Sequence, residues 1–262
     1  MQLEKLREGL HVSASQLRTY MTCPRKYEYR YVRGVEPEFT TAALVLGTAT
    51  HAALALFYRG IMERSAVPEF EECKTAFREA LAAARKGVVP IEETETDIEA
   101  QGAALLRLFY DGARESPPVV LAVEYPFAVE LNHPTTGEVL QERLIGGMDL
   151  VVQEAGRTTV VEHKTASRKW SQDQVRHDLQ ITCYRLAAAK LGMGEVGLRV
   201  QQLVKTKTPS VVTVEAERGE RDINDLLCII VGILGAVDAQ AFFPVRSGKC
   251  LTCPFRRRCA SE

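Results

Sequence analysis

The chain has 262 residues, of which 46% are hydrophobic and 26% charged, and its net charge is −1. This composition is that of a globular protein with a substantial core, in one large domain or two small ones. A near-zero net charge excludes binding to nucleic acid or membranes through overall charge alone. The opening residues MQLEKLREGLHVSAS lack the apolar core of a signal peptide, and no long apolar run follows. We therefore expect a cytoplasmic protein without a membrane partner.

The first part of the chain, residues 12–116, is expected to be helical. Three segments carry apolar residues at helical spacing, namely 50–64, 68–86 and 97–115. Pro68 suits the first turn of its helix, and Gly87 suits a C-terminal stop. These helices would form a layer ahead of the sheet.

Strands dominate the middle part, residues 117–220, and a helix with a cysteine-rich tail forms the last part, residues 221–262. Strands are expected at 117–131, at 140–154, at 156–166 and twice within 195–216, with helices at 171–192 and 221–243. This order predicts an α/β core with helical additions. The sequence contains no repeat and no low-complexity linker, so we expect a single domain.

Charged residues interrupt two of the expected strands. Glu162 and Lys164 in VVEHKT are two residues apart and project from one face, whereas His163 projects from the other. Asp149 interrupts the apolar strand IGGMDLVV. On adjacent strands, Asp149 and Glu162 could bind one hard cation such as Mg²⁺, with Lys164 beside a phosphate. The alternative is a set of surface acids in ion pairs.

Further polar residues follow on the helix after these strands. Gln180 and Tyr184 are spaced i, i+4 and are expected to share a polar face with Asp173 and His177. The opposite, core-facing stripe would hold Val175, Leu179, Thr182 and Leu186. Upstream, GTATH places His51 at an expected helix start. Its imidazole could be another metal ligand, although a structural role is the alternative.

The chain has seven cysteines, an odd number that argues against a disulfide framework. Cys73, Cys183 and Cys228 lie in apolar helical patterns and are expected in the core. Four others remain, namely Cys23 in MTCPRKYEYRYV and the C-x2-C-x5-C array of Cys250, Cys253 and Cys259. Four thiolates can bind zinc or an iron-sulfur cluster. One distant ligand is less natural for a zinc finger, and free tail thiols with a buried Cys23 are the third alternative.

Basic residues accompany these cysteines at both ends. The first run spans residues 18–33 and the second spans 246–258, which contains no acidic residue. If the cysteines meet, the two runs merge into one positive surface that could bind phosphates. Two separate solvated faces are the alternative.

Taken together, these residues resemble the PD-(D/E)XK nuclease superfamily in its RecB-like branch. The resemblance lies in the segment Gly47 to His51, in Asp149 after glycines, in Glu162-His163-Lys164, and in Gln180 with Tyr184. The cysteine pattern resembles the iron-sulfur nuclease domain of AddB and the CRISPR-associated iron-sulfur exonucleases. The resemblance extends over residues 12–259 and implies an α/β fold of the restriction-endonuclease type, in which helices flank a central mixed sheet.

The resemblance implies a 4Fe-4S cluster bound by Cys23, Cys250, Cys253 and Cys259, which would hold the C-terminal tail against the N-terminal segment. It also implies a magnesium or manganese site formed by His51, Asp149, Glu162 and the main-chain carbonyl of His163. Lys164 would then position the attacking water and stabilise the transition state. Gln180 and Tyr184 would orient the DNA strand or the lysine.

The activity implied is that of a metal-dependent DNA exonuclease acting on single-stranded DNA or DNA ends, in repair or recombination. A helicase is a possible partner. One alternative is a CRISPR adaptation nuclease that processes spacer precursors with partner proteins. Another is a non-catalytic DNA-binding scaffold with an iron-sulfur cluster, which intact Asp149, Glu162 and Lys164 disfavour.

Overall fold

The protein is described by a computed structural model that covers residues 3–85 and 95–262. The described residues form a six-stranded sheet in the order β1-β3-β4-β5-β6, with β2 also paired to β3. The strands are β1 (His11–Val12), β2 (Val119–Asn132), β3 (Val139–Glu154), β4 (Arg157–Ala166), β5 (Gly197–Val204) and β6 (Ser210–Ala216).

The sheet is mixed, as the family resemblance implied. β2 and β3 form a long antiparallel hairpin, and β3 continues antiparallel to β4. β4 and β5 are parallel, which requires a crossover, and the helices between them supply it. β5 pairs antiparallel with β6, and the short β1 lies parallel to β3.

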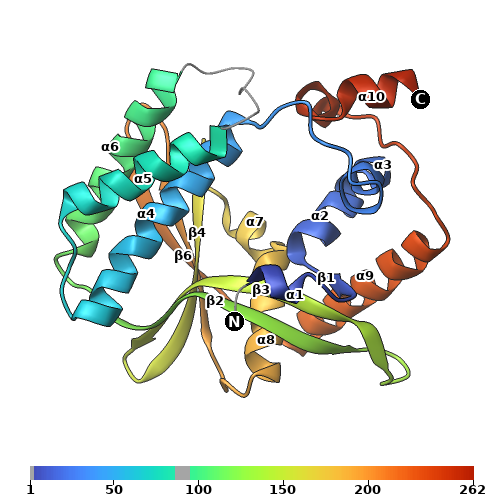
Figure 1. Ribbon diagram of the computed structural model, residues 1–262. Helices are drawn as coiled ribbons and strands as arrows, with labels where there is room; N and C mark the ends of the chain where they lie inside the picture. The colour runs from blue at the N-terminus through green and yellow to red at the C-terminus, as the bar shows by residue number, and fades with distance from the viewer. Residues whose placement is uncertain (1–2, 86–94) are drawn as a thin grey trace.

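One face of the sheet is covered by α4 (Ala42–Arg64), α5 (Phe70–Arg85) and α6 (Glu95–Ala113), as Figure 1 shows. α4 begins eight residues before the expected start at residue 50, because Thr41 caps it by accepting a hydrogen bond from the Leu44 N–H at 3.3 Å. His51 therefore lies inside this helix, and the prediction that it starts a helix was wrong. The end expected at residue 86 and the stop at Gly87 lie outside the described residues.

Apolar side chains from these three helices pack onto the sheet. Phe57, Phe77, Leu105 and Phe109 are fully buried there, together with Leu150 of β3. α4 is long and apolar enough to span a membrane by length and composition, but more than half of its apolar stretch is buried in this fold. This is the burial pattern of a core helix.

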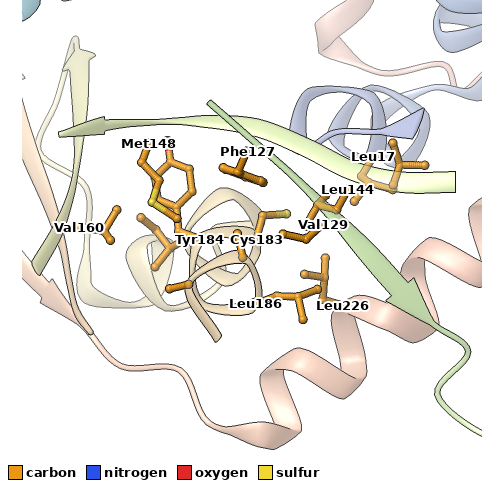
Figure 2. Close-up of a cluster of buried hydrophobic side chains, with 14 of the residues drawn as sticks. Leu17, Phe127, Val129, Leu144, Met148, Val160, Cys183, Tyr184, Leu186 and Leu226 are labelled. Carbon is orange, nitrogen blue, oxygen red and sulfur yellow. The ribbon is translucent and has the colours of Figure 1, made fainter. Parts of the chain in front are cut away.

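The opposite face is covered by α2 (Ala14–Thr22), α8 (Leu179–Lys190) and α9 (Glu220–Asp238). Figure 2 shows this second core, which includes Phe127 of β2, Met148 of β3 and Tyr184 of α8. Cys183 is buried here, and Cys73 is buried under the first layer, as predicted. Cys228 is exposed on α9, so its predicted core position was wrong: it lies on a side of that helix which faces solvent.

The single helix expected at 171–192 consists of two helices, α7 (Gln172–Arg176) and α8. The chain leaves helical geometry at His177, and Asp178 starts α8 by accepting a hydrogen bond from the Gln180 N–H at 2.9 Å. Asp173 and His177 therefore do not continue the helical face of Gln180, as had been predicted.

The N-terminal segment 14–33 lies beside the C-terminal segment that follows α9, as Figure 1 shows. The N-terminal part adds α1 (Leu3–Leu6), α3 (Pro24–Tyr27) and the π-helical turn Glu28–Val32, and the C-terminal part adds the 3-10 turn Gly248–Thr252 and α10 (Arg256–Ser261). The Tyr20 hydroxyl donates to the Ala241 carbonyl at 2.8 Å, and Arg25 Nε donates to the Phe242 carbonyl at 2.9 Å. The Tyr29 ring packs 5.7 Å from that of Phe255.

Candidate active site

The candidate site lies at a gap in the hydrogen bonding of β3. On one edge of this strand, β1 pairs with Arg143 and Leu144, and β4 pairs from Leu150 onward. Among the described strands, none pairs with residues 145–149 along this edge. Backbone groups of this stretch are therefore available to side chains, and Asp149 lies at its end.

The Asp149 carboxylate is oriented by groups from β4 and α4. It accepts a hydrogen bond from the backbone N–H of His163 at 2.9 Å, and His51 Nδ1 lies 3.5 Å from its other oxygen. Burial favours the neutral acid, but the contacts with His51 and His163 outweigh it and hold the pKa of Asp149 well below its usual range. Burial likewise lowers the pKa of His51, but Asp149 outweighs it and leaves that pKa raised. The contacts with His51 and the His163 N–H therefore stabilise the ionised form of the Asp149 carboxylate.

Glu162 is the most buried acid of the site, with only 2% of its side chain exposed. Its carboxylate forms an ion pair with Lys164 and accepts a hydrogen bond from the Tyr184 hydroxyl at 2.5 Å. Burial raises the pKa of Glu162, and the nearby charge of Asp149 raises it further. A cation bound between Asp149 and Glu162 would relieve the repulsion between their negative charges, so the two carboxylates favour cation binding.

Gln180 and Tyr184 connect α8 to these strands. Lys164 Nζ donates to the Gln180 side-chain oxygen at 3.3 Å, and Gln180 Nε2 donates to the Tyr184 hydroxyl at 2.9 Å. Tyr184 also lies 2.7 Å from the carbonyl of Gly147 in the β3 gap. The i, i+4 spacing thus places both side chains against the Glu162–Lys164 pair.

His163 points to the other side of the sheet, as strand alternation predicted. Its ring stacks on Tyr58 at 5.7 Å with an angle of 10°, and the His51 ring lies 6.3 Å away. Burial lowers the pKa of His163 to about 4, so this ring is neutral at physiological pH. Its predicted role as a ligand concerns its main-chain carbonyl and stays a prediction.

The metal site itself is not preformed. Among residues 3–85 and 95–262, no group of three or more His, Cys, Asp or Glu side chains is arranged to hold a metal ion. Asp149 faces His51 and the His163 N–H, whereas Glu162 faces Lys164 and Tyr184. The donor types nevertheless fit Mg²⁺ or Mn²⁺, since β3, β4 and α4 contribute two carboxylates and an imidazole.

A second candidate site lies where the two ends of the chain meet. A cavity of about 260 Å³ is lined by four cysteines from both ends, namely Cys23, Cys250, Cys253 and Cys259. The Val245 N–H donates to Cys23 Sγ, and the Ser247 N–H donates to Cys250 Sγ, each at 3.5 Å. Amide hydrogen bonds to sulfur are typical of thiolates that bind iron-sulfur clusters. Four thiols are donors that zinc or an iron-sulfur cluster can take, but within the described part of the chain no three of them are already arranged around a metal position.

The basic runs beside these cysteines are partly neutralised. Glu262 bonds to Arg33 at 3.0 Å and to Arg258 at 3.1 Å. Glu38 accepts a hydrogen bond from the Arg257 N–H at 3.1 Å. The two runs do meet, but carboxylates lie among the arginines, so the surface is less positive than the sequence suggested.

Trp170 and Gln202 also belong to the site, and sequence analysis did not identify either. Lys164 Nζ lies 5.9 Å from the centre of the Trp170 ring, and the backbone N–H of Trp170 donates to Gln202 Oε1 at 2.7 Å. Gln202 is fully buried and lies opposite Lys164 in the β4–β5 ladder. A polar QQ pair inside the apolar strand GLRVQQLV was a signal that could have pointed to it.

Comparison with protein families matches residues 11–260 to the PD-(D/E)XK nuclease superfamily. Among curated proteins, none matches the chain. Among solved structures, a protein from Eubacterium rectale described as "Putative exonuclease" is similar, with a TM-score of 0.58 and 14% sequence identity. The match covers 98% of this chain and 90% of that one. At this identity the likeness supports the fold alone.

Proposed function

The chain belongs to the PD-(D/E)XK nuclease superfamily, and from that membership we propose that it is a metal-dependent DNA exonuclease of the RecB-like branch. We propose that it acts in the cytoplasm on single-stranded DNA or DNA ends, in repair or recombination, and carries a structural 4Fe-4S cluster. The observation that supports this best is the chain of contacts from Lys164 through Glu162 and Tyr184 to the β3 gap beside Asp149.

The proposed metal ligands are His51, Asp149, Glu162 and the carbonyl of His163. A bound Mg²⁺ or Mn²⁺ supplies Lewis acidity, which activates water for attack and neutralises charge on the phosphate. Asp149 is held ionised by its contacts with His51 and the His163 N–H, and is therefore prepared to bind a cation.

Lys164 acts by hydrogen bonding, without coordinating the metal. Its ammonium has three N–H donors, and Glu162 and Gln180 take two of them, so the third can donate a hydrogen bond to the attacking water or to a phosphate oxygen. Gln180 and Tyr184 keep Lys164 and Glu162 in place rather than reacting themselves. In the hydrolysis the water oxygen would bond to phosphorus, the P–O bond to the leaving oxygen would break, and the proton that the water loses would balance the proton that the leaving oxygen gains.

The cluster is proposed to have a structural role. Its four cysteines line one cavity between the two ends of the chain and lie apart from Glu162 and Lys164 in the fold. Binding there would link residue 23 to residues 250–259. The hydrogen bonds that already join the two ends indicate that the cysteines act together with protein contacts in this linkage.

The test is a nuclease assay with Mg²⁺ or Mn²⁺ on end-labelled single-stranded DNA. Lys164→Ala is expected to lower the rate by about 10²–10³-fold while DNA binding persists, because the lysine acts on the transition state. Lys190→Ala is the matched control, since Lys190 lies at the far end of α8 and bonds to Asn132. Wild-type protein that binds DNA but does not cleave it would contradict the proposal and favour a scaffold.

A further inference from the structure

Trp170 is the single tryptophan of the chain and lies beside the proposed catalytic lysine. Its ring is partly exposed, and Lys164 Nζ lies 5.9 Å from the ring centre. The backbone of Trp170 is fixed by the hydrogen bond from its N–H to the buried Gln202 side chain. The side chain packs partly against the second core and stays partly exposed, and an exposed aromatic surface next to a reacting centre is suited to stacking.

Two cavities share Trp170 as part of their wall. The first, about 600 Å³, also contains Thr165 next to Lys164, together with Arg168 and Lys205. Among the described residues that line this cavity, none is acidic. Phosphates that enter it therefore meet the positive side chain of Arg168 close to the Trp170 ring.

The second cavity, about 790 Å³, continues on the other side of Trp170 and Gln174. It is lined by Arg18, His177 and Lys249, and by Asp178, which is paired with Arg18 at 3.1 Å. Trp170 thus separates two basic hollows, one of which reaches the strand that carries Lys164. A chain with regularly spaced phosphates and flat bases between them matches this arrangement.

We propose that Trp170 is a base-stacking platform for single-stranded DNA, and that it fixes the nucleotide next to the scissile phosphate. This inference rests on the proposed nuclease function and adds a substrate subsite to it. The strand would run from one hollow to the other, with one base on the Trp170 ring and the adjacent phosphate beside Lys164. A duplex keeps its bases stacked inside the helix, so this subsite favours single strands over duplex DNA.

Because the chain has one tryptophan, its own fluorescence reports on the platform. Short oligo(dT) is added to the wild-type protein in EDTA, where no cleavage occurs, and binding is measured independently by anisotropy of a labelled oligonucleotide. We expect tryptophan quenching that follows the anisotropy curve. Binding without any change in tryptophan fluorescence would overturn the inference and leave the nuclease proposal intact.

Substitutions separate stacking from phosphate contacts. Trp170→Ala is expected to weaken oligo(dT) binding about tenfold, whereas Trp170→Phe, which keeps a ring, loses much less. An abasic oligonucleotide of the same length should bind wild-type protein about tenfold more weakly than oligo(dT), and Trp170→Ala should no longer distinguish the two. Phe70→Ala is the control, since Phe70 packs on Tyr110 in the helical layer.

The outcomes distinguish this inference from the nuclease proposal. Equal discrimination against the abasic strand in wild type and Trp170→Ala would refute the platform, whatever the cleavage rate. Failure of the wild-type protein to bind any oligonucleotide would contradict the nuclease proposal and the platform together. Thermal unfolding of Trp170→Phe and Trp170→Ala identifies loss of folding, and the Phe variant retains the packing needed for a valid comparison.

Discussion

The Tyr184 hydroxyl carries one proton but contacts three polar groups, namely Glu162 at 2.5 Å, the Gly147 carbonyl at 2.7 Å and Gln180 Nε2 at 2.9 Å. Burial raises the pKa of this phenol well above its usual value, so it stays a neutral donor. Burial and the charge of Asp149 raise the pKa of Glu162, and the hydrogen bond from Tyr184 favours the ionised form and so offsets part of that rise. The Tyr184 hydroxyl thus contacts the unpaired stretch of β3 and also influences the ionisation of Glu162.

Tyr184→Phe tests this link through pH. Removing the hydroxyl removes a stabilising contact from the Glu162 carboxylate, so the pKa of Glu162 rises. If cleavage requires ionised Glu162, the acid limb of the pH profile of kcat/KM moves to higher pH in the variant. Tyr125→Phe, at an exposed position of β2, should leave the profile unchanged. An acid limb that stays in place in Tyr184→Phe would show that the hydroxyl does not act on the catalytic carboxylate.

At the scale of elements, the position of α8 depends on Arg218, which follows β6. Its guanidinium is buried and donates to Thr182 Oγ1 at 2.8 Å, to the Val175 carbonyl at 2.7 Å and to the Asp178 carbonyl at 3.3 Å. These acceptors lie at the end of α7 and in the first turn of α8. One side chain therefore fixes the junction that orients Gln180.

Arg218→Met keeps apolar bulk but leaves the Val175 and Asp178 carbonyls without this donor. We expect the free energy of unfolding to fall by about 3 kcal/mol, because buried carbonyls lose hydrogen bonds to a charged group. Urea unfolding measures this effect. The exposed Arg221→Met should change stability by less than about 0.5 kcal/mol. Equal small effects in both variants would mean that water replaces the guanidinium at the junction.

The strands could be predicted from the local sequence pattern, whereas the junction between α7 and α8 could not. β2, β3 and β4 begin and end within two residues of their expected bounds, because alternation and turn residues mark them. No turn residue and no change of periodicity indicates the break in the helix at His177, since apolar residues keep their helical spacing through it. It is produced by Arg218, which is distant in sequence, and by the Asp178 cap.

The site was predictable in its acids and lysine but not in its surroundings. Asp149, Glu162 and Lys164 are charged residues in apolar strands, and such interruptions are visible in sequence. Trp170 follows the end of β4 without periodicity, and its contact with Lys164 depends on Gln202 in a different strand. β4 and β5 are separated along the chain by α7 and α8, and a contact across such a crossover is not visible in local spacing.

At the scale of the whole molecule, the ends of the chain are joined by polar contacts and by the four-cysteine cavity. Tyr29 Oη donates to Glu262 at 2.9 Å, and the Glu38 N–H donates to the Pro254 carbonyl at 2.9 Å. These contacts hold Cys23 next to the tail cysteines, although the two segments lie far apart in sequence. A bound cluster would close this long loop covalently, which restricts the unfolded chain.

Cys23→Ser removes the one predicted ligand from the N-terminal segment. Anaerobically purified wild-type protein is expected to be brown and to contain iron and sulfide, and the variant should contain less of both and unfold at a lower temperature. The lost stability is at most about 5 kcal/mol in the chain-entropy account of crosslinks. Cys228→Ser is the matched control, because Cys228 is exposed on α9 and does not line the cavity. Colourless wild-type protein with stoichiometric zinc would assign the cavity to zinc, and unchanged iron and stability in Cys23→Ser would remove Cys23 from the ligand set.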